Sequence, residues 1–296
     1  MTAPSPFGRV ATAMVTPFRP DGGLDLDGAQ RLASHLVEHG NDGIVVSGTT
    51  GESPTTTDAE KRQLIEAVIE AVGDRARITA GVGTNDTAHS VELAGAALDA
   101  GAHAVLAVAP YYNKPPQEGV LAHFRAIADA TDLPVMLYDI PGRTGIPLAV
   151  DTLVRAAEHP RIRAVKDAKG DLWAATQVMA QTDLLWFSGD DDLNLAHLAN
   201  GATGVVSVVG HAAGDAYAEM VAAVDKGDLP RAREVHRQLV PAVNAIMHIT
   251  QGAIMAKAAV RELGVLDSAA VRLPLVEATP AQVAAVRDGL TASGLM

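Results

Sequence analysis

The chain has 296 residues, 48% of them hydrophobic, so it can bury one large core or two small ones. Its formal net charge of −12 argues against nucleic acid or an anionic membrane surface as its main partner. It contains no cysteine, which excludes disulfides, thiolate metal sites and cysteine nucleophiles.

The N-terminal residues 1–10 have neither the charged start nor the apolar stretch of a secretory signal. No apolar run approaches the roughly 20 residues that a membrane-spanning helix needs. We therefore expect a soluble, cytoplasmic protein.

Short apolar runs alternate with amphipathic segments along most of the chain. The amphipathic segments carry helix signals: Thr57 and Glu60 form a capping box, apolar residues follow at helical spacing, and Gly73 supplies a stop. The short runs predict strands at Val10–Thr16, Gly43–Ser47, Arg77–Val82, Ala104–Ala109, Pro134–Asp139, Ile162–Ala168, Leu184–Ser188 and Gly204–Val209.

Strand–helix units in this order predict an α/β protein built on a closed (β/α)8 barrel, a TIM barrel, which typically takes about 250 residues. A doubly wound open sheet is the alternative, but it usually has fewer strands and a crossover. Strand signals end near Ala213, and the rest of the chain predicts three or more helices. We therefore expect a catalytic barrel over residues 1–212 and a C-terminal helical extension over residues 213–296.

The carboxyl ends of the strands carry the chemistry of such barrels. The second expected strand runs into Ser47-Gly-Thr-Thr-Gly-Glu-Ser53, where backbone N–H groups and two hydroxyls can face a small anion such as a carboxylate. A plain Gly/Thr turn is the alternative. The fourth strand runs into a proline-stiffened loop with two consecutive tyrosines, which are more often packing residues than catalytic ones.

Tyr138 lies near the end of the fifth strand, and Arg143 lies in the turn after it, where a guanidinium can clamp a carboxylate. The sixth strand is interrupted by Lys166, one of only six lysines in the chain. Burial lowers the pKa of a lysine toward the neutral amine, which can attack a ketone and form a Schiff base. The alternative is a strand-end lysine whose ammonium group reaches solvent.

Adjacent strands lie about 4.8 Å apart, so Tyr138 and Lys166 on the fifth and sixth strands can share one pocket. A phenol beside a Schiff-base lysine is suited to carry protons. Because all of these motifs fall on one rim of the predicted barrel, we favour the catalytic interpretation of Lys166.

These residues resemble the dihydrodipicolinate synthase/N-acetylneuraminate lyase family of pyruvate-dependent class I lyases. The resemblance extends from Val15-Thr-Pro17 to Arg272-Leu-Pro274. Its most specific parts are Gly48-Thr-Thr-Gly-Glu-Ser53, Tyr111-Tyr-Asn113, Tyr138-Asp-Ile-Pro-Gly-Arg-Thr-Gly145, Lys166-Asp-Ala168 and Ser188-Gly-Asp-Asp191.

The resemblance implies four catalytic residues. Lys166 would form the Schiff base with the keto carbon of pyruvate, and Tyr138 would relay protons and help to hold the pyruvate carboxylate. Thr49 would link Tyr138 to Tyr112, and Tyr112 would come from the neighbouring subunit. The family thus implies a homo-oligomer, a tetramer built as a dimer of dimers.

The resemblance also implies the residues that bind substrate. Thr50 would bind the pyruvate carboxylate, and Arg143 would bind the carboxylate of the second substrate. Gly189 and Val206 would supply backbone contacts near Lys166.

The reaction that the resemblance implies joins pyruvate to L-aspartate 4-semialdehyde and gives 4-hydroxy-tetrahydrodipicolinate, a step toward diaminopimelate and lysine. It needs no metal and no organic cofactor. Arg143 and the tyrosine pair favour this synthase branch over an N-acetylneuraminate or 2-keto-3-deoxy sugar acid lyase. Asp139 stands where many members have asparagine.

Two positions differ from the site at which many family members bind feedback lysine. His89 stands where a glutamate helps to hold the lysine ammonium group, and Lys61 replaces a common histidine. Cationic or neutral groups disfavour a cationic ligand, so we expect weak inhibition by lysine or none.

Two other interpretations stay open. His35-Leu-Val-Glu38-His39 matches a motif of some zinc hydrolases, although a solvated end of the first barrel helix explains the same residues. A barrel that only binds or senses a keto acid is the second, and the intact set of catalytic residues argues against it.

Overall fold

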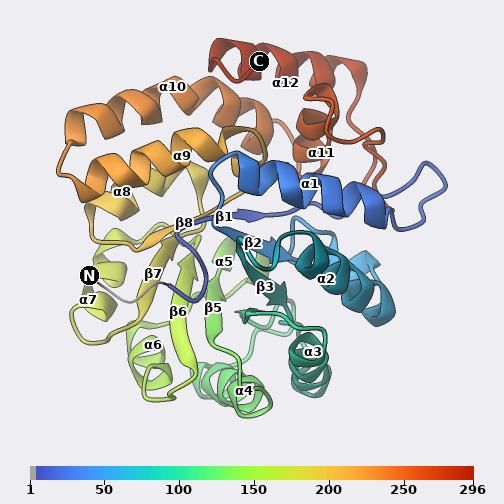
Figure 1. The fold of residues 1–296 in the computed structure, drawn as a ribbon. Coiled ribbons are helices and arrows are strands. Elements are labelled where there is room, and N and C mark those ends of the chain that lie inside the picture. The colour runs from blue at the N-terminus through green and yellow to red at the C-terminus, as the bar shows by residue number, and fades with distance from the viewer. Residues whose placement is uncertain (1–4) are drawn as a thin grey trace.

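A computed structural model describes residues 5–296. Eight parallel strands form a closed barrel in chain order, and β1 pairs with both β2 and β8 (Figure 1). The TIM-barrel prediction is therefore confirmed. The strands are β1 (Val10–Ala13), β2 (Gly43–Val46), β3 (Arg77–Gly81), β4 (Ala104–Val108), β5 (Val135–Asp139), β6 (Ile162–Asp167), β7 (Leu185–Ser188) and β8 (Gly204–Ser207).

Helices follow the strands around the outside of the barrel. The predicted capping box is formed, because Thr57 Oγ1 accepts from Glu60 N (3.2 Å) and Glu60 Oε2 accepts from Thr57 N (2.8 Å). The helices are α1 (Leu26–Glu38), α2 (Asp58–Val72), α3 (Thr87–Asp99), α4 (Gln117–Asp129), α5 (Pro141–Thr144), α6 (Val150–Ala156), α7 (Leu172–Met179), α8 (Asn194–Ala199) and α9 (Gly210–Asp225), with short 3-10 turns η1 (Ser53–Thr55) and η2 (Asp191–Leu193).

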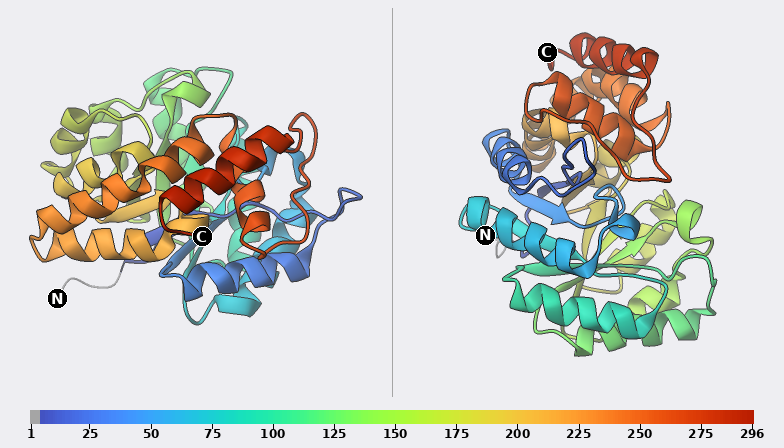
Figure 2. Two further views of the ribbon diagram at one scale, coloured as in Figure 1. Left: turned by 90° about the horizontal axis from the view of Figure 1, so that it is seen from above. Right: turned by 90° about the vertical axis from the view of Figure 1, so that its right-hand side faces the viewer.

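The C-terminal layer consists of α10 (Leu229–Met247), α11 (Gly252–Glu262) and α12 (Pro280–Ala292). Helix α10 packs on α9 and α12, and α11 also packs on α12. Figure 2 shows this layer gathered on one side of the barrel. The expected boundary at residues 212/213 falls inside α9, beside a kink at Ala213, and the division into two domains stays a prediction.

Alternating side chains divide the core into two parts. Apolar residues such as Met136, Ala164 and Phe187 pack together inside the barrel, whereas Leu137 and Val165 belong to the cluster between the barrel and its helices. This alternation turns every second residue of β5 and β6 toward the barrel interior.

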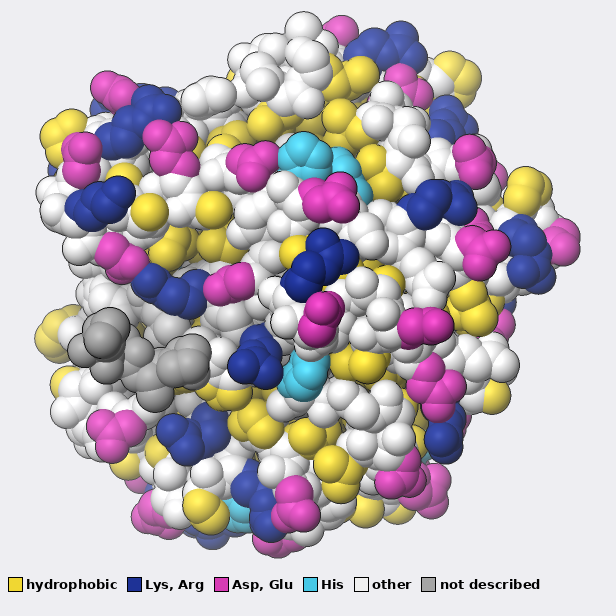
Figure 3. Space-filling view, in the orientation of Figure 1, with side chains coloured by type: hydrophobic (Ala, Val, Ile, Leu, Met, Phe, Trp, Pro, Cys, Tyr) yellow, Lys and Arg dark blue, Asp and Glu magenta, His cyan; other side chains and the backbone are white. Residues whose placement is uncertain are grey.

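Within residues 5–296 no single helix is long and apolar enough to cross a membrane. Helices α10 and α11 pass such a test only together, as a pair bent by 114°. On the face drawn in Figure 3, acidic and basic side chains are intermixed.

Candidate active site

Lys166 lies on β6 in direct register with Tyr138 on β5. It is 4% exposed, and its Nζ lies 4.2 Å from the centre of the Tyr138 ring. The pKa of Lys166 is lowered to about 8, chiefly by burial; the carboxylate of Asp191 opposes the shift, and the positive charge of Arg143 adds to it. The site therefore contains an amine that is neutral far more often than an exposed lysine at the same pH.

Tyr138 is buried beside this amine. Burial raises the pKa of its phenol well above the ordinary value, and Arg143 partly counteracts the rise. The phenol is therefore protonated at neutral pH and able to donate a hydrogen bond. A protonated phenol in contact with an amine that is partly neutral is an arrangement in which the phenol can act as a proton donor.

A cavity of about 330 Å³ opens at the carboxyl ends of the strands. Its wall includes four of the predicted site residues, which are Thr49, Tyr112, Tyr138 and Arg143. Lys166 does not itself line the cavity, but its amine contacts the ring of Tyr138, which does line it. The cavity is large enough for small organic acids.

Gly189 packs directly against the Lys166 side chain. A Cβ atom placed on Gly189 would lie 2.7 Å from Lys166 Cγ and 2.9 Å from Lys166 Cε. Val206 on β8 belongs to the same interior cluster as Tyr138. The absence of a side chain at Gly189 therefore gives the Lys166 chain its path toward Tyr138.

The segment Gly48–Ser53, which we call the threonine loop, holds Thr49 and Thr50. It is closed by hydrogen bonds from Glu52 N to Thr49 O (3.1 Å) and from Ser53 N to Gly48 O (3.3 Å). Thr49 lines the cavity, and Thr50 is buried. No hydrogen bond joins Thr49 to Tyr138 or Tyr112 in the described part of the chain, so the predicted relay stays a prediction.

Tyr112 differs from the buried Tyr138: it lies in the cavity wall but is open to solvent. Its side chain is 88% exposed, and its backbone has a left-handed φ of +71°. A non-glycine residue in this conformation is uncommon and indicates an outside constraint or a function.

A model of the dihydrodipicolinate synthetase family matches residues 6–293. The chain belongs to this family.

Similar proteins extend over the full length of the chain. The 4-hydroxy-tetrahydrodipicolinate synthase of Kineococcus radiotolerans is 61% identical over 98% of this chain and 94% of its own. A dihydrodipicolinate synthase of Cyanidioschyzon merolae, solved with lysine bound, is 42% identical with a TM-score of 0.95 over 98% of this chain and 99% of its own. The chloride-inhibited dihydrodipicolinate synthase of Acinetobacter baumannii, solved with pyruvate, is 37% identical with a TM-score of 0.93 over 97% and 99%.

The sequence did not predict one buried carboxylate near Lys166, that of Asp191. Asp190 caps η2 through its side chain, whereas the next residue, Asp191, is buried. Its oxygens accept from Tyr217 OH (2.8 Å), from the backbone N of Val208 (2.9 Å) and of Val209 (3.2 Å), and from Asn194 and Ser207. Asp191 thus ties the segment after β7 to the β8–α9 junction, and it is the negative charge that acts on Lys166.

Lys61 and His89, the two residues predicted at the feedback-lysine position, both contact the carboxylate of Asp58. Lys61 is buried, and its Nζ donates to Thr56 O (2.6 Å) and lies 3.3 Å from Asp58 Oδ1. His89 Nε2 lies 2.9 Å from Asp58 Oδ2. The Asp58 carboxylate is therefore already occupied by the Lys61 ammonium group and the His89 imidazole of the same chain.

The zinc interpretation finds no support in the geometry. His35 Nε2 pairs with the backbone oxygen of His211 (3.2 Å), and His39 Nδ1 pairs with Asp215 Oδ2 (2.8 Å). Among residues 5–296, no group of three or more potential ligands is arranged to hold a metal ion. Both histidines instead attach α1 to α9.

Proposed function

We propose that this protein condenses pyruvate with L-aspartate 4-semialdehyde to 4-hydroxy-tetrahydrodipicolinate through a Schiff base on Lys166. The observation that carries the proposal is the buried Lys166 amine against the Tyr138 ring. The full-length similarity to proteins named 4-hydroxy-tetrahydrodipicolinate synthase, and the relative solved with pyruvate, support it.

The first step is the attack of the neutral Lys166 amine on the keto carbon of pyruvate. The keto oxygen leaves as water with one proton from the amine and one taken up from solution, and the nitrogen keeps its other proton in a protonated imine. Tyr138 is the nearest phenol that can move the protons of this step, since its ring touches the amine.

The second step uses the protonated imine as an electron sink. The pyruvate methyl group loses a proton and becomes an enamine, whose carbon attacks the aldehyde of the second substrate. The amino group of that substrate then attacks the imine carbon and displaces Lys166, which closes the ring and frees the amine for another cycle.

The threonine loop and Arg143 divide the binding of the two carboxylates. Thr50 binds the pyruvate carboxylate through its hydroxyl and backbone N–H, and Gly189 and Val206 line the pyruvate end. Arg143 is exposed at the wall of the cavity and binds the carboxylate of the semialdehyde. The reaction requires neither a metal nor an organic cofactor, because the protonated imine formed on Lys166 serves as the electron sink.

We further propose that the protein works in the cytoplasm as a homotetramer, a dimer of dimers, in which Tyr112 completes the site of the partner subunit. The exposed, left-handed Tyr112 at the cavity wall supports this arrangement. The catalytic unit is then a dimer, with Thr49 linking the partner's tyrosine to Tyr138.

The discriminating test is a substrate comparison. Turnover is measured with pyruvate and aspartate semialdehyde, and in the cleavage direction with N-acetylneuraminate and with 2-keto-3-deoxy sugar acids. We expect turnover with the first pair alone, and an Arg143→Gln variant with a raised KM for the semialdehyde. Cleavage of a sugar acid as the main activity would refute the proposal, and binding of pyruvate without turnover would favour a sensor.

Regulation by lysine is expected to be weak or absent. Lys61 and His89 bring cationic or neutral groups to the position where many family members bind feedback lysine. The nearby Asp58 carboxylate is already paired with both side chains. A steady-state assay with added lysine tests this, and inhibition at sub-millimolar lysine would refute it.

A further inference from the structure

A buried ion pair connects the threonine loop to the C-terminal layer. Lys257 on α11 is completely buried, and its Nζ donates to Glu52 Oε1 (2.5 Å) and to Ala270 O (2.6 Å). The same Nζ lies 4.1 Å from the centre of the Phe18 ring. The proposed chemistry does not use this lysine, although it is one of only six in the chain.

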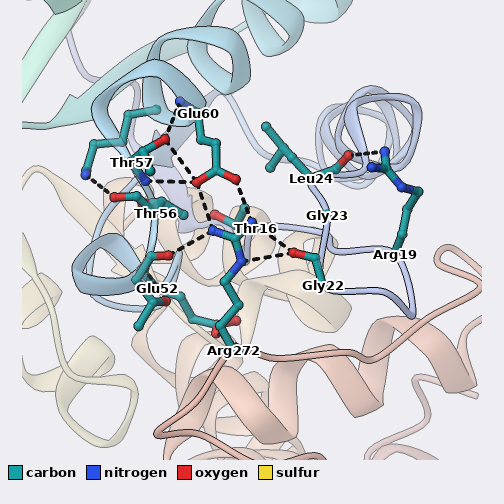
Figure 4. Close-up of polar contacts among 12 residues, drawn as sticks. Thr16, Arg19, Gly22, Gly23, Leu24, Glu52, Thr56, Thr57, Glu60 and Arg272 are labelled. Carbon is teal, nitrogen blue, oxygen red and sulfur yellow. Dashed lines mark hydrogen bonds and ion pairs between the residues drawn. The ribbon is translucent and has the colours of Figure 1, made fainter.

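Arg272 completes the connection. Its backbone N donates to the other Glu52 oxygen, Oε2 (2.9 Å). Its guanidinium donates to both carboxylate oxygens of Glu60 (2.8 and 2.5 Å) and to the backbone oxygens of Gly22 and Thr55 (Figure 4). Both oxygens of Glu52 are thus held by residues from the C-terminal part of the chain.

Glu52 sits where the threonine loop needs support. Its backbone has a left-handed φ of +54°, a conformation that is unfavourable for a non-glycine residue. Its N–H donates to Thr49 O, and Thr16 Oγ1 donates to the neighbouring Gly51 O (2.6 Å). A shift of Glu52 would therefore pull directly on the carbonyl of Thr49.

A gain in folding stability does not by itself explain the buried Glu52–Lys257 ion pair. Replacement of a buried ion pair by apolar groups of similar volume is often neutral or stabilising, because both charges must lose their hydration. A charged pair is instead well suited to hold one geometry. Here it holds the loop that carries the substrate-facing hydroxyls.

We propose that Glu52, Lys257 and Arg272 are positioning residues through which the C-terminal layer holds the threonine loop in the shape that binds the pyruvate carboxylate. This inference rests on the proposed function, since it concerns the same pocket. It gives the C-terminal layer a role in substrate affinity.

The test compares Lys257→Met, Glu52→Gln and the double variant with the wild type. Pyruvate is titrated, the adduct is trapped with borohydride, and the half-saturating concentration is measured together with the thermal unfolding midpoint. We expect each variant to need about tenfold more pyruvate, the effect of losing one charge-assisted contact. The double variant has no unpaired buried charge, so its midpoint should return toward the wild-type value while its pyruvate requirement stays raised.

Arg287→Gln is the matched control. Arg287 pairs with Glu262 (2.6 Å) and so joins α12 to α11 within the same layer, without contact to the threonine loop. We expect it to bind pyruvate as the wild type does, whereas an equal rise in this control would overturn the proposal.

A double variant with wild-type pyruvate affinity would also overturn the proposal, because the cluster would then be structural only. Failure of the wild type itself to form any adduct would refute the proposed function, and the positioning role with it. The wild-type arm therefore separates the two failures.

Discussion

At the scale of single residues, the protonation of Lys166 is controlled by burial and by two charges of opposite sign. With a pKa of about 8, roughly one amine in ten is neutral at pH 7, against a few in ten thousand for an ordinary lysine. In the proposed mechanism, this neutral fraction is the nucleophile of the first step.

The rate of adduct formation with pyruvate, measured without the second substrate, should rise with pH and level off above about pH 8. Arg143→Gln should move this limb to higher pH, because loss of a positive charge raises the pKa of Lys166. Borohydride trapping at short times across pH 6–10 gives the profile. A limb near pH 10 in the wild type, or a limb that Arg143→Gln leaves in place, would contradict this account.

The space that Gly189 leaves for Lys166 gives a second prediction. Gly189→Ala would place a Cβ atom within 2.9 Å of two carbons of the lysine chain, so the amine must move away from Tyr138. We expect adduct formation to slow by about a hundredfold, because misplacement of a reacting group by about 1 Å has effects of this size. Gly95→Ala on α3 is the control, since nothing lies within 4 Å of its added Cβ atom. Wild-type adduct rates in Gly189→Ala would show that this contact is unimportant.

Sequence patterns predicted that Lys166 and Tyr138 lie side by side, because a polar residue in a buried strand is rare and because adjacent strands bring their ends together; the register of β5 and β6 confirms this placement. Asp191 was not identified, since three consecutive aspartates look alike in sequence and only one of them is buried among five donors. Lys257 was passed over because helical spacing cannot show that a lysine is buried.

At the scale of elements, Asp139 at the end of β5 pairs with Lys169 in the segment that follows β6. Lys169 Nζ lies 3.3 Å from Asp139 Oδ2, and Asp139 Oδ1 accepts from Leu148 N (3.1 Å). Burial raises the pKa of Asp139 to about 6, and Lys169 opposes the rise. The buried carboxyl of Asp139 is thus accompanied by a nearby cation.

This pKa sets the sign of a pH effect on stability. The folded protein holds the Asp139 proton more tightly than the unfolded chain, so stability falls as pH rises from about 4 to 6. Asp139→Asn should remove this fall, which is at most about 3 kcal/mol. Chemical unfolding of both proteins at pH 4.5, 5.5 and 7 measures it. An unchanged difference between them across this range would contradict the prediction.

Strand existence was predictable, but strand ends were less so. The first and second strands were expected to reach Thr16 and Ser47, yet they end at Ala13 and Val46. Ser47 has a left-handed φ of +57°, which breaks the strand although Ser47 itself remains buried. Hydrophobic alternation reports burial, and burial continues into the loops that build the site.

At the scale of the whole molecule, the exposed Tyr112 predicts that activity depends on assembly. Two variants of low activity, Lys166→Arg and Tyr112→Phe, can be mixed, unfolded and refolded together. If Tyr112 crosses the interface, a mixed dimer contains one site with both natural residues, and activity should recover. Activity that stays at the sum of the separate variants would show that Tyr112 acts within its own chain.

The order of strands and helices was sufficient to predict the closed barrel, because each unit buries one face against the next. The attachment of the C-terminal layer to the threonine loop was not predictable, since Glu52 and Lys257 are 205 residues apart in sequence. Long-range polar contacts of this kind leave no periodic signal.

The most direct test of the central claim is peptide mapping after borohydride reduction with pyruvate. The account predicts one modified residue, with N-(1-carboxyethyl)lysine at Lys166, and no adduct in Lys166→Arg. An unmodified Lys166, or an adduct at any of the other five lysines instead, would contradict it.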